Sequence, residues 1–188
     1  MNKRIFIASL AAMAVFASGC TTSGSGTGDP AARRKAIDAA VDSSLSTLYQ
    51  QEPSSRDLVG RAAGVLVFPN VMEAGFIVGA SRGQGALRVG GKTVSYHATT
   101  SGSFGLQAGA QSTAVILLFM TRDALQRFQN SNGWTVGADA SVTLLTVGAT
   151  AQMTTATAQQ PVIGYVLSNR GLMAGVTMDG TRITRLDL

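Results

Sequence analysis

The chain has 188 residues, a formal net charge of +5 and a single cysteine. This length suits one folded domain with its own core, and so mild a positive charge argues against a nucleic-acid-binding protein. One cysteine excludes an internal disulfide framework. The 22 glycines are more than an average chain of this length carries, which predicts tight turns and flat strands.

The first 19 residues have the pattern of a secretory signal peptide. Lys3 and Arg4 precede an apolar run at residues 5–16, and small residues follow at 17–19. An apolar run of this length is shorter than the roughly 20 residues that a membrane-spanning helix needs. Removal of the peptide would lower the net charge to about +3, since Lys3 and Arg4 leave with it.

Cys20 follows these small residues directly. The arrangement resembles the bacterial lipobox, although Ala17 stands where Leu is more common. The resemblance implies that Cys20 becomes the mature N-terminus and carries acyl chains such as palmitate, which anchor the protein in a membrane. The alternative is an ordinary signal peptide that leaves Cys20 as a free thiol.

Residues 21–28 contain only Thr, Ser and Gly, a composition typical of a flexible tether. Eight such residues reach roughly 16 Å. Thr21 and Thr22 occupy positions where Asp commonly retains lipoproteins at the inner membrane. The resemblance therefore favours the outer membrane, with the periplasmic and the external side both left open.

A first helix is predicted over residues 30–50. Asp29 and Pro30 suit its N-cap and first position, and an apolar residue recurs every three or four positions. This stripe consists of Ile37, Val41, Leu45 and Leu48.

Three consecutive cations, Arg33, Arg34 and Lys35, lie near the start of this helix. Cations at a helix N-terminus oppose the helix dipole, at a cost of a few tenths of a kcal/mol. The cluster is therefore either a functional contact or a solvated basic turn. After Pro53, Ser54 and Asp57 resemble a capping box for a short second helix that ends at residue 61 or 62.

Strand patterns begin at residue 64. We expect a strand at 65–68 that Pro69 ends, and a second strand at 75–80 that a turn at 82–85 follows. A hairpin should come next, with strands at 86–89 and 92–98 joined by a turn at Gly90 and Gly91. Residues 102–111 alternate small with larger side chains. Residues 113–120 are apolar on both faces, which predicts a central, buried strand.

Thr121 is the expected N-cap of an internal helix whose apolar side carries Leu125 and Phe128. Strand character resumes at 134–147. Residues 149–160 suit a loop or an edge strand, and the end of the chain predicts three consecutive antiparallel strands. These three strands are expected at 162–168, 172–178 and 181–186.

Together these elements predict a β-rich α+β fold. It would consist of one or two bent antiparallel sheets, an N-terminal helical segment and one internal helix, in a single domain over residues 29–188.

The order of the motifs resembles the SYLF family of lipid-binding domains, which occurs in bacterial exported proteins and in eukaryotic actin-patch proteins. The matching stretches extend over roughly residues 32–180. Thr93 and residues 145–148 depart from the family pattern, and the chain stops at Leu188 without the family's longer tail, so actin contact through such a tail is not expected. The matching stretches are residues 63–69, 74–79, 82–85, 102–109, 137–140, 165 and 168–176.

What the resemblance implies is binding of acidic phospholipids through the first helix. Arg33, Arg34 and Lys35 would contact the headgroups, and Ile37 and Val41 would insert. Leu45 and Leu48 are expected to pack on the sheet instead.

The sequence gives little support to catalysis. Residues 79–83 fit G-x-S-x-G around Ser81, but no acidic residue lies between Ser81 and the only histidine, His97. A G-x-G-x-x-G at residue 83 fails because position 88 is Arg, and Asp179–Gly180 indicates a turn, not a calcium loop. With His97 alone, no metal site and no cofactor are expected.

Three functions therefore compete. The first is a lipid-anchored, non-enzymatic domain that binds acidic phospholipid or a related ligand. The second is a structural or envelope-stress lipoprotein that binds a protein partner. The third is a hydrolase that uses Ser81.

Overall fold

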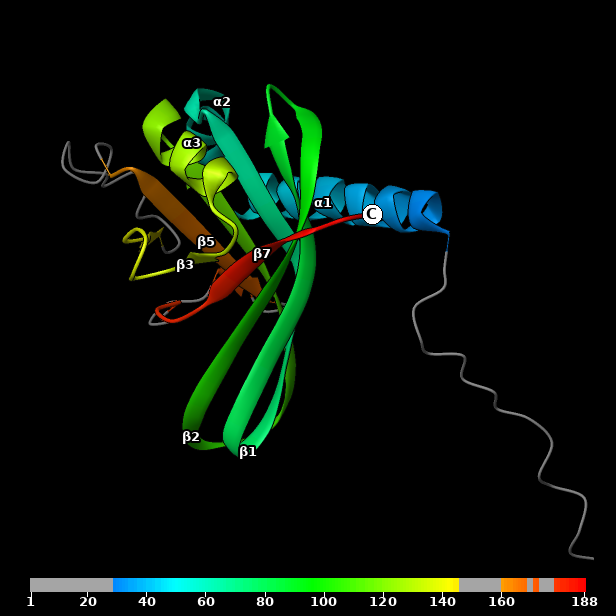
Figure 1. The fold of residues 1–188 in the computed structure, drawn as a ribbon, viewed down its shortest axis with the longest axis vertical. Helices are drawn as coiled ribbons and strands as arrows, with labels where there is room; N and C mark the ends of the chain where they lie inside the picture. The colour runs from blue at the N-terminus through cyan, green and yellow to red at the C-terminus, as the bar shows by residue number, and fades with distance from the viewer. Residues whose placement is uncertain (1–28, 146–159, 169–170, 173–177) are drawn as a thin grey trace, which may run out of the picture.

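A computed structural model describes residues 29–145, 160–168, 171–172 and 178–188 (Figure 1). Its fold is α+β and β-rich, which confirms the predicted class. The helices are α1 (Pro30–Gln51), α2 (Ser55–Arg61) and α3 (Arg122–Asn130), and the strands are β1 (Gly64–Val89), β2 (Lys92–Phe119), β3 (Trp134–Thr135), β4 (Thr143–Leu145), β5 (Val162–Ser168), β6 (Gly171–Leu172) and β7 (Arg182–Leu186).

Strands β1 and β2 form one long antiparallel hairpin, which corrects the prediction of several short strands. Gly90 and Gly91 make its turn, as expected, and both have positive φ angles, 58° and 79°. Pro69 does not end β1, because an irregularity between Phe68 and Val71 accommodates it within the strand. The turn expected at residues 82–85 is absent, since these residues pair with 97–100 of β2.

The hairpin bends back on itself, so that the second half of β1 crosses the first (Figure 1). The contact is closest at Gly85, where an added Cβ would lie 2.0 Å from the carbonyl oxygen of Val67. β5 pairs with the second half of β2 and β7 with the first half. The two halves of β2 thus pair with different strands, β7 and β5, and the sheet curls between them.

The end of β2 is the buried centre of the sheet, as the sequence predicted. Residues 115–119 are buried, and they pair with β1 on one side and β5 on the other. The sheet as a whole is mixed, because β4 runs parallel to β5.

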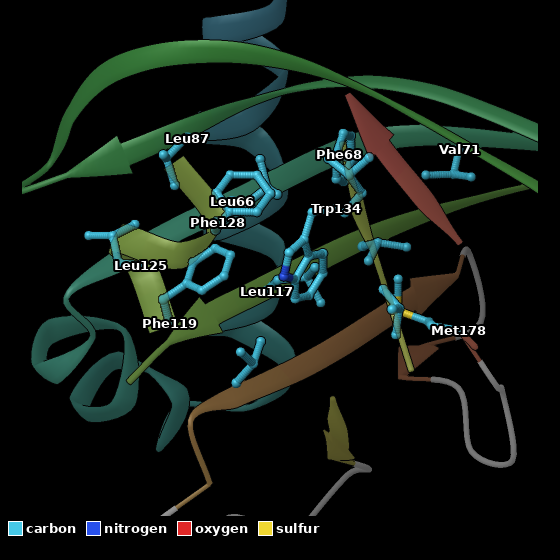
Figure 2. Close-up of a cluster of buried hydrophobic side chains, with 14 of the residues drawn as sticks. Leu66, Phe68, Val71, Leu87, Leu117, Phe119, Leu125, Phe128, Trp134 and Met178 are labelled. Carbon is cyan, nitrogen blue, oxygen red and sulfur yellow. The ribbon is translucent and has the colours of Figure 1, made fainter. Parts of the chain in front are cut away.

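A first core cluster fills the space between the two parts of the curled sheet, and α3 contributes to it (Figure 2). Three aromatic rings meet there: the Phe128 centroid lies 4.9 Å from that of Phe119 and 5.6 Å from that of Trp134. Thr121 caps α3 as predicted, accepting a 3.2 Å hydrogen bond from the backbone N–H of Ala124.

A second core cluster holds α1 against the outer face of the sheet. All four residues of the predicted stripe are buried, together with residues of β1, β2 and β5. Asp29 caps the helix, accepting a 3.0 Å hydrogen bond from the Ala31 N–H. The sequence therefore predicted this helix to within one residue of its observed end.

The capping box expected at Ser54 does not form. Ser54 has a helical backbone conformation, and its hydroxyl donates to the Glu52 carboxylate instead of accepting from the helix. An N-cap side chain usually requires an extended backbone to reach the first N–H groups. The short helix itself, α2, is present as predicted.

The last strands are connected differently from the expected meander. β6 pairs with β5, but β7 pairs with β2 and β3. The strand expected at 134–147 is two short strands, β3 and β4, because Gly137 adopts a positive φ between them. Most of the segment 149–160, and residues 173–177 of the predicted strand 172–178, lie outside the described residues.

Candidate binding surface at the start of helix α1

The basic cluster Arg33, Arg34 and Lys35 lies in the first turns of α1. Lys35 is exposed, whereas Arg33 and Arg34 are partly buried. The Arg34 guanidinium donates to the main-chain oxygen of Leu188, and Arg33 Nη2 lies 3.4 Å from Gln84 Oε1. None of the three cations forms a salt bridge with an Asp or Glu side chain that the structure describes.

The surroundings leave these charges prominent. Apart from Lys35, the exposed positions of the first turns are Pro30 and alanines, which neither shield nor neutralise a cation. Asp29, at the N-cap, is the nearest exposed carboxylate in the sequence. The helix start therefore carries a surplus of positive charge on a small-residue surface. Its exposed alanines are Ala31, Ala32, Ala36 and Ala39.

The two residues expected to insert into a membrane face the sheet instead. Ile37 is 9% exposed and Val41 is fully buried. In this conformation both belong to the second core cluster, as Leu45 and Leu48 do. Contact of Ile37 or Val41 with lipid therefore requires α1 to leave the sheet, whereas the cations contact solvent without any such movement.

Polar contacts fix α1 over the β1–β2 turn. The Asp38 carboxylate accepts hydrogen bonds from Thr93 Oγ1 at 2.8 Å and from the Tyr96 hydroxyl at 2.9 Å. Arg88 forms a salt bridge with Asp42 and donates to the Asp38 carbonyl at 3.3 Å. We call these five residues the α1 latch.

The latch also changes two pKa values. Burial, followed by the hydrogen bond to Asp38, raises the pKa of Tyr96 above its usual value. The hydrogen bond from Arg88 lowers the pKa of the exposed Asp42 carboxyl. Tyr96 is therefore a neutral donor and Asp42 an anion near neutral pH, as their hydrogen bonds require. The latch was not predictable from the sequence, because its members come from three separate elements.

Ser81 and His97 are not brought together as a catalytic pair. Ser81 is paired across the hairpin with Ser101, with 2.6 Å between the two hydroxyls. His97 lies opposite Gly85, 2.8 Å from the Ser95 hydroxyl. Burial lowers the pKa of His97 to about 4, and its ring packs on Phe128. Both side chains have local structural partners.

Within the described ranges, no three His, Cys, Asp or Glu side chains gather as a metal site would require. The helices of the same part of the chain are too short or too polar to cross a bilayer.

The second half of the chain matches a known protein family. Residues 100–187 match the model of the family described as Ysc84, Las17-binding protein actin regulator. This part of the chain is similar to the Ysc84 (SYLF) family. The match begins within β2 and extends through α3 to β7, so α1 and the motifs before residue 100 lie outside it. Comparison with curated proteins gave no match.

The SYLF assignment confirms the resemblance drawn from the sequence motifs. Three of the stretches that carried it fall in the matched range: 102–109, 137–140, and residue 165 with 168–176. The family is one of binding domains, which is compatible with a non-enzymatic protein.

Proposed function

We propose that this protein is a membrane-anchored, non-enzymatic SYLF-domain protein that binds acidic phospholipid surfaces through the start of α1. The observation that carries the proposal is the surplus of positive charge at the start of α1, where Lys35 is exposed and Arg33 and Arg34 are partly exposed. The cluster begins at residue 33, shortly after the predicted tether at 21–28, so a membrane anchor at Cys20 would hold it close to a bilayer surface.

The magnitude of the attraction supports this role. Each Lys or Arg near an anionic leaflet contributes about 1 kcal/mol, so three cations contribute about 3 kcal/mol. This corresponds to roughly a 100-fold change in affinity. Salt screens such an interaction, because the Debye length falls from about 30 Å at 0.01 M to about 8 Å at 0.15 M.

The anchor is part of the same proposal. Residues 1–19 act as a signal peptide, Cys20 carries the acyl chains, and residues 21–28 connect them to the domain. One acyl chain gives only reversible membrane binding, so a second signal makes the attachment durable. The basic cluster supplies an additional, lipid-selective signal. The bacterial outer membrane is the location that Thr21 and Thr22 favour.

Ile37 and Val41 would contact lipid only under one condition. With α1 docked, the cations alone contact the headgroups, and the apolar stripe stays in the core. Insertion of Ile37 and Val41 would follow only when the α1 latch opens. We propose the docked form as the one that recognises the surface, since it exposes no buried side chain.

A protein partner is the second candidate. The description of the matching family names binding to Las17, which is itself a protein partner. If a protein is the partner, the anchored domain would recruit it to the envelope, and the basic cluster would be a solvated turn.

Vesicle binding separates the two candidates. The chain from Asp29 to Leu188 keeps every described helix and strand, and its cooperative unfolding is to be checked first. Binding to vesicles that contain phosphatidylglycerol, but not to phosphatidylcholine vesicles, is expected. Changing Arg33, Arg34 and Lys35 to Ala should weaken it roughly 100-fold at low salt. Equal binding to both vesicle types, or none to either, would contradict the lipid proposal.

A matched control removes the same charge elsewhere. Lys92, Arg122 and Arg127 are exposed and form no salt bridge with a described residue. Their triple change to Ala should leave binding to anionic vesicles within about threefold of the original chain, because these cations lie outside the start of α1. An equal loss in both triple variants would indicate net charge rather than a site.

A further inference from the structure

A pocket lies at the opposite end of α1 from the basic cluster. Its volume is about 580 Å³, and the second half of α1, α2 and the β1–β2 turn surround it. This size is within the range of about 300–1,000 Å³ typical of sites for small molecules. Its apolar lining comes from three elements, through Leu45, Val59 and Val65.

Two arginines line the same pocket. The Arg56 guanidinium stacks on the Tyr49 ring, 4.4 Å from its centroid, and forms no salt bridge with a described residue. Arg88 is paired with Asp42, which also lines the pocket. The charged groups of the pocket therefore sum to one net positive charge.

Arg88 also has an unused donor. Its Nε atom is buried and has no hydrogen-bond partner among the described residues. A buried donor without a partner is unfavourable, so a shift of the Arg88 side chain that brings Nε to an acceptor in the pocket would relieve this cost. An anionic oxygen is the acceptor that two arginines favour most.

We propose that this pocket binds one anionic amphiphile, a molecule with a phosphate or carboxylate group next to an apolar segment. The anionic group lies between Arg56 and Arg88, and the apolar segment covers Leu45, Val59 and Val65. The site is separate from the basic cluster, so it does not depend on the function proposed above. It binds a single molecule, whereas the cluster contacts a surface.

Calorimetric titration of the full chain carrying Cys20→Ser tests the proposal. The probes are dodecyl phosphate and dodecanoate below their micelle concentrations, with inorganic phosphate and the uncharged dodecyl maltoside as comparisons. We expect both charged amphiphiles to bind at least tenfold more tightly than either comparison. If inorganic phosphate binds as tightly as the charged amphiphiles, the apolar part of the proposal is overturned. If dodecyl maltoside binds as tightly as they do, the anionic part is overturned.

Gly60 offers a way to fill the pocket without straining the fold. It lines the pocket, and an added Cβ there would have no atom within 4 Å. Gly60→Trp should reduce dodecyl phosphate binding at least tenfold, whereas Gly60→Ala should retain it. Arg56→Gln should weaken it about tenfold, because Arg56 forms no salt bridge with a described carboxylate that the change would leave unpaired.

The two sites are distinguished by the triple variant of Arg33, Arg34 and Lys35. We expect this variant to lose vesicle binding and to keep dodecyl phosphate binding. Undiminished dodecyl phosphate binding in Gly60→Trp would overturn the pocket assignment, whatever the outcome with vesicles.

Discussion

The hydroxyl of Tyr96 in β2 donates a 2.9 Å hydrogen bond to the carboxylate of Asp38 in α1. The two residues are 58 positions apart in the sequence, so this bond ties the helix to the sheet. Together with the buried apolar stripe, it holds the start of α1 in one position. The basic cluster is therefore presented by a fixed helix.

We expect Asp38 and Tyr96 to be energetically coupled. Tyr96→Phe should lower the free energy of unfolding by about 1 kcal/mol, the usual contribution of one hydrogen bond. Asp38→Ala should lower it by about 2 kcal/mol, because two hydroxyls, of Thr93 and Tyr96, lose their acceptor. Urea unfolding of both single variants and the double variant measures the coupling. Strictly additive effects would show that the bond contributes nothing.

Gly85→Ala should destabilise the protein strongly. The added methyl group would lie 2.0 Å from the Val67 carbonyl oxygen, so the crossing halves of β1 would have to separate. We expect a loss of about 3 kcal/mol or more in the free energy of unfolding. Gly102→Ala is the matched control, since Gly102 is also in a strand but has no atom within 4 Å of the added Cβ. Equal effects of the two changes would contradict the crossing.

His97 should make stability depend on pH. Its pKa is about 4 in the folded protein and about 6.5 when unfolded, so the unfolded state binds more protons between these values. Stability should therefore fall as the pH falls from 6.5 to 4, by about 3 kcal/mol in total. Urea unfolding at pH 7 and pH 4 should show this loss, and His97→Gln should reduce it. An unchanged pH dependence in the variant would rule out His97 as its source.

Local patterns predicted much of the fold correctly. The apolar spacing of α1, the caps at Asp29 and Thr121 and the two-glycine turn at Gly90 each act over a few residues, and each is present. The buried character of residues 115–119 was also visible, because a strand covered on both faces is apolar throughout.

Long-range contacts explain the errors. Pro69 is a local stop signal, but an irregularity in β1 accommodates it because pairing with β2 continues on both sides. The sequence pattern predicted Gly85 in a turn. In the structure, its lack of a side chain allows two strand segments to cross. The pairing of β7 with β2 brings together residues that no local pattern connects.

The candidate site was only partly predictable. The apolar stripe indicates that one face of α1 is covered, but not whether the sheet or a membrane covers it, and the structure places Ile37 and Val41 on the sheet. The α1 latch and the pocket beside Arg56 arise from residues distant in sequence. Neither has a motif by which the sequence alone would reveal it.

The salt dependence of binding to phosphatidylglycerol vesicles tests the central claim most directly. For the chain from Asp29 to Leu188, we predict that affinity falls steeply from low to physiological salt and exceeds that of the Arg33, Arg34 and Lys35 triple variant by roughly 100-fold at low salt. The variant should show almost no salt dependence. Equal affinity of the two proteins at low salt would contradict membrane recognition by the start of α1.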